Sequence, residues 1–167
     1  MLIISKVRLF LLALWLGAAC FFSFAVAPGV FGIVPSREIA GAVVSRSLMI
    51  VNYSGLIISL ILLASSFISA KGIAVWIERF LLFVLLISTL IGQFVISLQL
   101  SQIRSQAARP IEELSIDEPL RIAFNSLHDY SVWVLIVGMI AAFISFFLIS
   151  SSKTETPIKN QFGNIKI

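Results

Sequence analysis

Residues 80–103 read FLLFVLLISTLIGQFVISLQLSQI and contain no Asp, Glu, Lys or Arg. An α-helix rises about 1.5 Å per residue, so about 20 apolar residues suffice to cross the hydrocarbon core of a bilayer. This run is longer than that and predicts a membrane-spanning helix. Three further stretches without charged residues meet the same criterion: 9–36, 47–70 and 130–152.

The composition of the whole chain supports a membrane protein. Of its 167 residues, 59% are hydrophobic and 12% are charged, whereas a soluble domain has about 45–50% apolar and about 25% charged residues. We therefore predict an all-α, polytopic membrane protein: a four-transmembrane-helix bundle in residues 1–152 with a long second helix, followed by a polar, flexible C-terminal tail at 153–167. The predicted spans are about 9–34, 47–70, 78–103 and 120–150.

The first apolar run has a second interpretation, because Lys6 and Arg8 precede it as in a signal peptide. A cleavable segment has an apolar run of about 7–15 residues, followed by small residues at the cleavage site. This run continues through FFSFAVAPGVF and is long enough to span, so we expect it to be retained as the first helix. Pro28 and Gly29 are expected to kink or end that helix near the far membrane face.

Polar residues within and between the spans predict local features. Ser36 is a candidate N-cap for a second helix covering about 36–69, and the polar group at 52–55 is a candidate contact with a neighbouring helix. Glutamine is costly in lipid, so Gln93, Gln99 and Gln102 are expected to face the bundle. A loop at about 105–116 follows, and Asp117 is expected to cap the fourth helix.

The distribution of basic residues predicts the orientation. Four spans place both termini on one side, and all of the lysines fall on that side: Lys6, Lys71, Lys153, Lys159 and Lys166. The positive-inside rule then favours a multi-pass protein of the cell membrane with both termini in the cytoplasm. The loop at 105–116 would face outward.

A polar stripe leads into the fourth span. Asp117, Arg121, Asn125 and His128 follow one another at spacings of four, four and three, which places them on one face of a helix. With polar residues at the ends of the second and third helices they define a predicted cluster: Arg46, Asn52, Arg104, Asp117, Arg121, Asn125, His128 and Asp129. Two interpretations stay open, namely a network that ties the helix ends together and a small pocket for an ion, cofactor or polar ligand.

Two segments of the chain carry a family resemblance. The stretch WLGAACFFSFAVAPGVFGIVPSREIAGAVVSRSL at 15–48 resembles the opening of the transmembrane protein 205-like family (domain of unknown function 4149). Arg104, an acidic loop, Arg121 and the segment FNSLHDYS at 124–131 are similar to the later part of that family. The resemblance covers about residues 10–150 and implies a four-helix integral membrane protein without an established biochemical activity.

The residues favour a non-enzymatic protein that requires no cofactor. The sequence has no Ser/His/Asp set with an obvious nucleophile, no Gly-rich phosphate loop and no His/Cys cluster. One alternative is a transporter or channel-like subunit, since an ionisable residue inside a membrane is a candidate for a solute pathway. The other is a metal or haem site on His128, assisted by Asp129 or Met139 and shared between two chains.

The expected partners are the lipid bilayer and, as a possibility, further copies of the same chain. The net charge is only +4 and no Lys/Arg-rich block is present, which argues against nucleic acid as a partner. The chain has one cysteine, Cys20, so it forms no internal disulfide.

Overall fold

The structure is a computed structural model that describes residues 2–67, 72–107 and 109–151. Within these ranges the chain is helical, with no strand. Its elements, in order, are α1 (Leu2–Phe21), η1 (Phe22–Val26), α2 (Ala27–Ile33), α3 (Arg37–Ser66), α4 (Ile73–Leu90), η2 (Ile91–Ile96), α5 (Ser97–Gln106), η3 (Ile111–Glu113) and α6 (Pro119–Ser151).

These elements join into four rods that are long and apolar enough to cross a membrane: Ile3–Ile33, Arg37–Ser66, Ile73–Gln106 and Pro119–Ser151. The predicted all-α four-helix bundle is therefore confirmed. The rods extend beyond the charge-free stretches, because the helices continue through charged residues that flank those stretches, such as Arg8, Glu78 and Arg104. The predicted tail at 153–167 lies outside the described residues.

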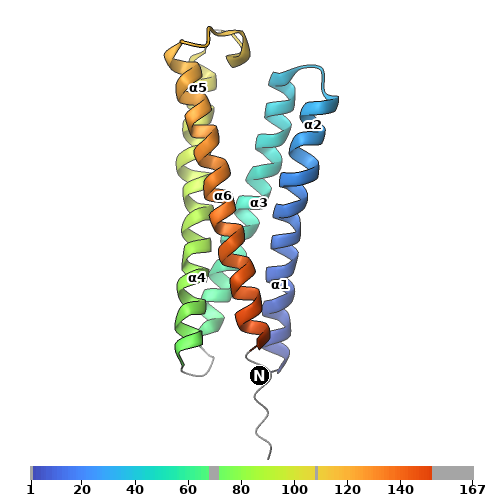
Figure 1. The fold of residues 1–167 in the computed structure, drawn as a ribbon, viewed down its shortest axis with the longest axis vertical. Helices are drawn as coiled ribbons and strands as arrows, with labels where there is room; N and C mark the ends of the chain where they lie inside the picture. The colour runs from blue at the N-terminus through green and yellow to red at the C-terminus, as the bar shows by residue number, and fades with distance from the viewer. Residues whose placement is uncertain (1, 68–71, 108, 152–167) are drawn as a thin grey trace, which may run out of the picture.

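The rods form an upright bundle of two hairpins (Figure 1). One hairpin is α1–α2 with α3, and the other is α4–α5 with α6; α4 packs against both α3 and α6, and α1 packs against α6 and α3. The start of α1 and the end of α6 lie at the same end of the bundle, which we call the termini end. At the opposite end, which holds the connections at 34–36 and 107–118 and is called the loop end, the two hairpins diverge.

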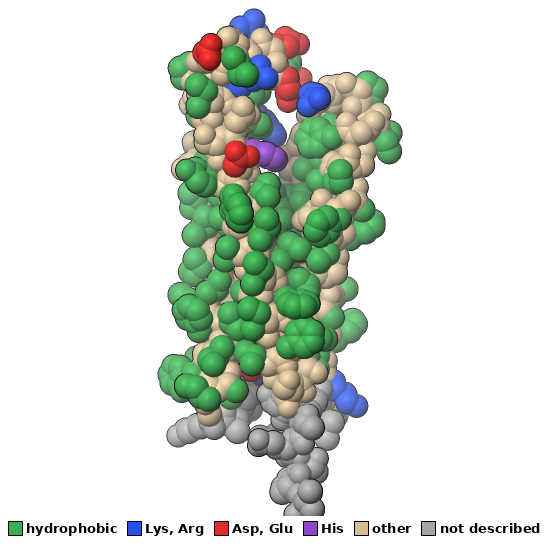
Figure 2. Space-filling view, in the orientation of Figure 1, with side chains coloured by type: hydrophobic (Ala, Val, Ile, Leu, Met, Phe, Trp, Pro, Cys, Tyr) green, Lys and Arg blue, Asp and Glu red, His purple; other side chains and the backbone are tan. Residues whose placement is uncertain are grey.

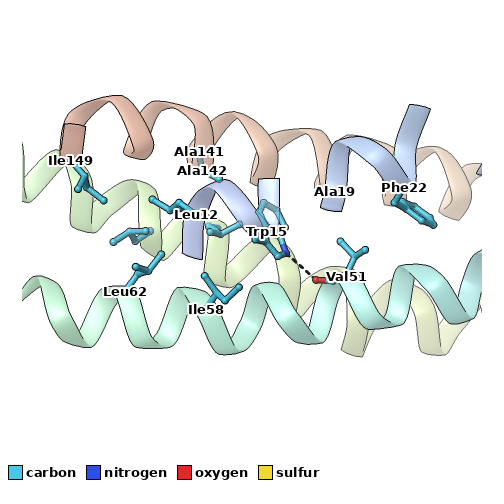
Figure 3. Close-up of a cluster of buried hydrophobic side chains, with 12 residues drawn as sticks. Leu12, Trp15, Ala19, Phe22, Val51, Ile58, Leu62, Ala141, Ala142 and Ile149 are labelled. Carbon is cyan, nitrogen blue, oxygen red and sulfur yellow. Dashed lines mark hydrogen bonds between the residues drawn. The ribbon is translucent and has the colours of Figure 1, made fainter. Parts of the chain in front are cut away.

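The hydrophobic core lies toward the termini end. Its largest buried apolar side chains are fully enclosed: Leu12, Trp15, Leu62, Leu82 and Leu85. Trp15 is the central residue, because its Nε1 donates a hydrogen bond of 3.0 Å to the carbonyl oxygen of Val51 across the α1–α3 interface (Figure 3). This bond satisfies the polar atom of a buried indole.

Gly55 permits the close approach of three helices. A Cβ atom built on this residue of α3 would lie 2.5 Å from Trp15 Nε1 and 2.7 Å from Thr89 Cγ2. Only glycine fits there without moving α1 or α4. The polar group predicted at 52–55 is thus divided: Asn52 and Gly55 are buried between helices, while Tyr53 is exposed.

Two π-helical segments interrupt the first and third rods. In η1 the backbone N–H of Ala27 donates to the carbonyl oxygen of Phe22, five residues earlier, just before Pro28. A proline clashes with the carbonyl four residues before it, and a π turn relieves this clash within a continuing helix. The helix therefore passes through Pro28 and ends only at Ile33.

The helix ends partly follow the sequence predictions. Ser36 caps α3 as predicted, since its hydroxyl accepts a hydrogen bond of 3.3 Å from the backbone N–H of Ile39. The prediction for Asp117 is wrong, because this residue lies in a turn and Glu118 immediately precedes α6. The residue before a proline is biased away from helical backbone angles, so Pro119 sets the start of the helix.

The glutamines of the third rod also differ from one another. Gln93 is buried as expected. Gln99 and Gln102 are exposed on α5, contrary to the prediction. They lie on the part of the rod that reaches the loop end, where water can replace a protein partner for the amide.

Candidate functional site

A cavity of about 870 Å³ opens between the two hairpins at the loop end. Its walls come from η1 and α2, from the first half of α3, from α5 with the connection that follows it, and from the first half of α6. Charged side chains gather at this end of the molecule, and the histidine lies at the edge of the hollow (Figure 2). We call this space the loop-end cavity.

The α6 wall of the loop-end cavity changes from polar to apolar along its length. The lining residues recur at spacings of three and four, which places them on one face of the helix. The polar members come first and the apolar members follow toward the middle of the bundle: Arg121, Asn125, His128 and Ser131, then Val132, Leu135, Ile136 and Met139.

The α3 wall shows the same gradient, whereas the wall from the first rod is apolar along most of its length. On α3 the lining begins with Arg37 and Glu38 and ends with Leu48. On the first rod it consists of aromatic and small residues, with Phe22 and Phe31 near its two limits. The π-helical η1 contributes three consecutive residues, 22–24, to the lining. Consecutive residues of a regular helix point about 100° apart, so this wall depends on the local irregularity.

Arg104 bridges the walls of the polar half of the cavity. Its Nη1 donates a hydrogen bond of 2.9 Å to Ser45 Oγ on α3, and its guanidinium carbon lies 5.1 Å from the centroid of the Phe124 ring on α6. Gly41 makes room for it, since a Cβ there would lie 3.2 Å from Arg104 Nη2. One half-buried guanidinium thus connects α5 with both α3 and α6.

Arg121 holds the connection between α5 and α6. Its Nη1 donates to the carbonyl oxygens of Leu114 at 2.6 Å and Glu112 at 3.4 Å. The connection is further anchored by Ile111 and Leu114, whose side chains are buried. An exposed ion pair of 3.7 Å between Arg109 and Glu118 also lies in this connection between α5 and α6.

The charges lining the cavity do not balance. Four arginines face it (Arg37, Arg104, Arg109 and Arg121) against two glutamates (Glu38 and Glu112). In the described part of the chain the ion pairs are Arg109–Glu118 and Arg8–Glu78. Arg104 and Arg121 donate their hydrogen bonds to a hydroxyl and to carbonyl oxygens, and Glu112 is a carboxylate of the lining whose charge acts on Arg104.

The structure brings together half of the predicted cluster. Arg104, Arg121, Asn125 and His128 all line the loop-end cavity. The other half lies elsewhere: Arg46, Asp117 and Asp129 are exposed and outside the lining, and Asn52 is buried deeper in the bundle. Arg46 is next to Ser45 on α3, and Asp129 is next to His128 on α6, so each points about 100° away from the cavity face.

Asn52 lines a second, much smaller cavity of about 10 Å³. Leu48, Ser131 and Leu135 line both cavities, so the small one adjoins the inner limit of the large one. Its polar lining includes Ser88 and Thr89 of α4, and a Cβ built on Gly92 of η2 would lie 3.3 Å from Asn52 Nδ2. The volume is about that of one water molecule.

The sequence analysis missed a buried ion pair near the termini end. Arg8 of α1 and Glu78 of α4 contact each other with side chains that are each 5% exposed. The sequence analysis considered Arg8 only as a basic residue ahead of the first apolar run, and it assigned no partner to Glu78. The sequence does indicate that the two residues lie at the same height in the bundle. Both α1 and α4 begin at the termini end, and Arg8 and Glu78 follow about one and a half turns after the start of their helices.

Metal ligands are not clustered in the structure. Over residues 2–67, 72–107 and 109–151, no group of three or more His, Cys, Asp and Glu side chains could hold an ion. His128 lies at the polar half of the loop-end cavity among arginines, and Met139 lies at its apolar limit.

Fold and site together define a class of protein: a multi-pass integral membrane protein whose four helices enclose an amphipathic cavity at one end. The chain belongs to the family of the domain of unknown function DUF4149, whose family model matches residues 10–109. The match includes Arg104 and ends before Arg121 and His128. None of the curated proteins and none of the solved structures matches this chain.

Proposed function

We propose that this protein is a non-enzymatic membrane protein that holds a small molecule in the loop-end cavity. The observation that carries the proposal is the size and lining of that cavity. Its volume of about 870 Å³ lies near the upper limit of about 300–1,000 Å³ for small-molecule sites, which are mostly apolar with a few polar groups that orient the ligand.

The kind of side chain in the lining favours binding over covalent chemistry. Arginines and apolar residues dominate it, and His128 is its one imidazole. A catalytic site pairs a nucleophile with a base and with a group that orients the base. The lining instead offers fixed cations and hydrophobic walls, which suit the retention of a molecule.

The proposal also includes the cell membrane as location, with both termini in the cytoplasm and the cavity facing outward. The distribution of lysines supports this orientation. A cysteine placed at Glu112 in a Cys20→Ser background tests it. We expect a membrane-impermeant thiol reagent to label that cysteine in intact cells; labelling only after lysis would reverse the orientation.

The binding proposal is tested by two neighbouring substitutions on α6. Ile136 lines the cavity, whereas Val137 is exposed on the outer face of the helix. We expect Ile136→Trp to remove a small molecule that co-purifies in mild detergent and is detected by mass spectrometry of an organic extract. Val137→Trp, the matched control, should retain it, and equal recovery from both variants would refute the proposal.

A transporter or channel-like subunit is the second candidate. The small polar cavity at Asn52 favours it, because it extends the loop-end cavity toward the middle of the bundle. Four helices are few for a solute pathway, so this function would need a homo-oligomer. We expect solute flux into proteoliposomes to be lost on Arg104→Ala if the protein is a transporter, and flux equal to that of wild type would exclude this pathway.

A haem or metal bound by His128 is a further proposal. Met139 also lines the cavity, but it lies about 16 Å along α6 from His128, so the two cannot ligate one iron from opposite sides. Comparison of the absorption spectra of wild type and His128→Ala tests the site.

We also propose that the chain is related to the transmembrane protein 205-like family. Arg121 and the segment at 124–131 support this relationship.

A further inference from the structure

We propose that the ligand of the loop-end cavity is one anionic phospholipid taken from the surrounding bilayer. Its phosphate would lie at Arg104, with Arg37 and Arg121 nearby, and its acyl chains would lie along the apolar half toward Met139. This inference rests on the proposed function, because it names the class of molecule that the same cavity holds.

The length of the cavity is comparable to that of one leaflet of a membrane. From Arg121 to Met139 the lining of α6 rises about 27 Å. Its apolar part, from Val132 to Met139, accounts for about 10 Å of this, which lies within half of the hydrocarbon thickness of about 30 Å. Its polar part then coincides with the headgroup region, where a phospholipid carries its phosphate.

The charge of the polar half selects an anion. Ser45 Oγ and backbone carbonyl oxygens orient the guanidinium groups of Arg104 and Arg121. Glu112 acts on Arg104, but the lining still holds four arginines against two glutamates. A charged group in an apolar surrounding is costly unless an opposite charge lies near it. A phosphate in this space would accept charge-assisted hydrogen bonds from donors that the protein already holds in place.

A free inorganic anion would fill only the polar half of the cavity. Phe22, Leu135 and Ile136 line a volume that phosphate alone leaves unfilled. Burial of acyl chains there is favourable by about 25 cal/mol per Å² of apolar surface removed from water. A molecule that is anionic at one end and apolar over the remainder satisfies both halves at once.

The cavity is also open to the side from which a lipid would enter. The hollow in Figure 2 faces outward between the upper part of α6 and α2, at the level where apolar side chains begin to cover the surface. Phe24 and Phe31 border this side of the lining and are exposed. A lipid can therefore move into the cavity sideways while its headgroup stays at the interface.

The test uses the full chain, purified in a neutral detergent and depleted of lipid. It is mixed with equal amounts of phosphatidylglycerol and phosphatidylcholine that carry the same acyl chains, and bound lipid is counted by native mass spectrometry. We expect one phosphatidylglycerol per chain, in preference to phosphatidylcholine. A separate arm with inorganic phosphate alone should give no comparable retention.

Substitutions then locate the binding. Arg104→Gln should weaken phosphatidylglycerol binding about tenfold or more and should reduce the preference for phosphatidylglycerol over phosphatidylcholine. Arg46→Gln is the matched control, because Arg46 is an exposed arginine of α3 outside the lining. Arg37→Gln, at the cavity mouth, should weaken phosphatidylglycerol binding by a smaller factor. This variant replaces Arg104→Gln in the test if Arg104→Gln does not fold.

The outcomes separate this inference from the proposed function. Equal binding of both lipids, insensitive to Arg104→Gln but abolished by Ile136→Trp, would overturn the anionic class and keep the cavity as a binding site. Retention of inorganic phosphate without lipid would overturn the proposal that the ligand is a lipid. Lipid binding that Ile136→Trp leaves intact would overturn both proposals, since the lipid would then lie outside the cavity.

Discussion

The two ends of the bundle differ in how tightly they are packed and in how their charged side chains are paired. At the termini end, Leu12, Trp15 and Leu82 are fully enclosed, and the buried charges of Arg8 and Glu78 contact each other. At the loop end the hairpins separate around about 870 Å³, and Arg104 has no carboxylate among its described contacts. The comparison shows that tight packing is concentrated at one end and that the other end holds a cavity with an excess of positive charge.

The largest expected effect is at the termini end. Glu78→Ala leaves the buried Arg8 guanidinium without its carboxylate, and breaking a buried pair typically costs about 3–5 kcal/mol. We expect the free energy of unfolding in mild detergent to fall by this amount. The double variant Arg8→Met with Glu78→Met should recover much of it, and a double variant as unstable as the single one would contradict this account.

The packing contrast gives a second prediction. Gly55→Ala places a methyl group against Trp15 and Thr89, and such overpacking costs about 1–3 kcal/mol. Gly17 of α1 is the control, because a Cβ there meets nothing within 4 Å. Thermal unfolding should show a clear loss for Gly55→Ala and no loss for Gly17→Ala; similar melting temperatures would show that the interface at Trp15 is loose.

At the loop end the effect on stability should be smaller and should depend on hydrogen bonding. Arg121→Ala removes donors to two carbonyl oxygens of the α5–α6 connection and should cost about 1.5 kcal/mol. Arg37 is exposed at the start of α3, so Arg37→Ala should cost less. Equal melting temperatures for the two variants would mean that the connection does not depend on Arg121.

The smallest expected effect is at His128. This side chain is exposed at the cavity edge, and substitutions at such positions usually change stability by no more than about 0.5 kcal/mol. We expect His128→Ala to unfold like wild type and to share its absorption spectrum. A Soret band or bound metal that is lost in the variant would replace the lipid with a cofactor as the ligand of this cavity.

What the sequence could predict was local. Apolar length identifies four spans, and the cap at Ser36 follows from one side chain and the first turn of its own helix. The spacing of Arg121, Asn125 and His128 also placed them correctly on one face. In each case the information lies within a single helix, so no relation between helices was needed.

What the sequence could not predict depends on how helices face one another. Asn52 was grouped with Arg104, yet it lies about 10 Å along α3 from Ser45, the residue of α3 that Arg104 contacts, and it borders a separate cavity. Arg8 and Glu78 belong to different rods, and their contact depends on the relative rotation of α1 and α4. The loop-end cavity is a space between hairpins, which no single stretch of sequence encodes.

The π-helical segment η1 has a consequence for how this protein can change over evolution. It contains one residue more than a regular helix needs. Deletion of one residue within 22–26 would keep the span apolar and long enough, and would let this segment close into a regular α-helix with Phe31 still on its present side. The three consecutive residues 22–24 would then lose the wide turn that lets them all line the cavity. One wall of the loop-end cavity is therefore set by the number of residues in the helix as well as by their identity.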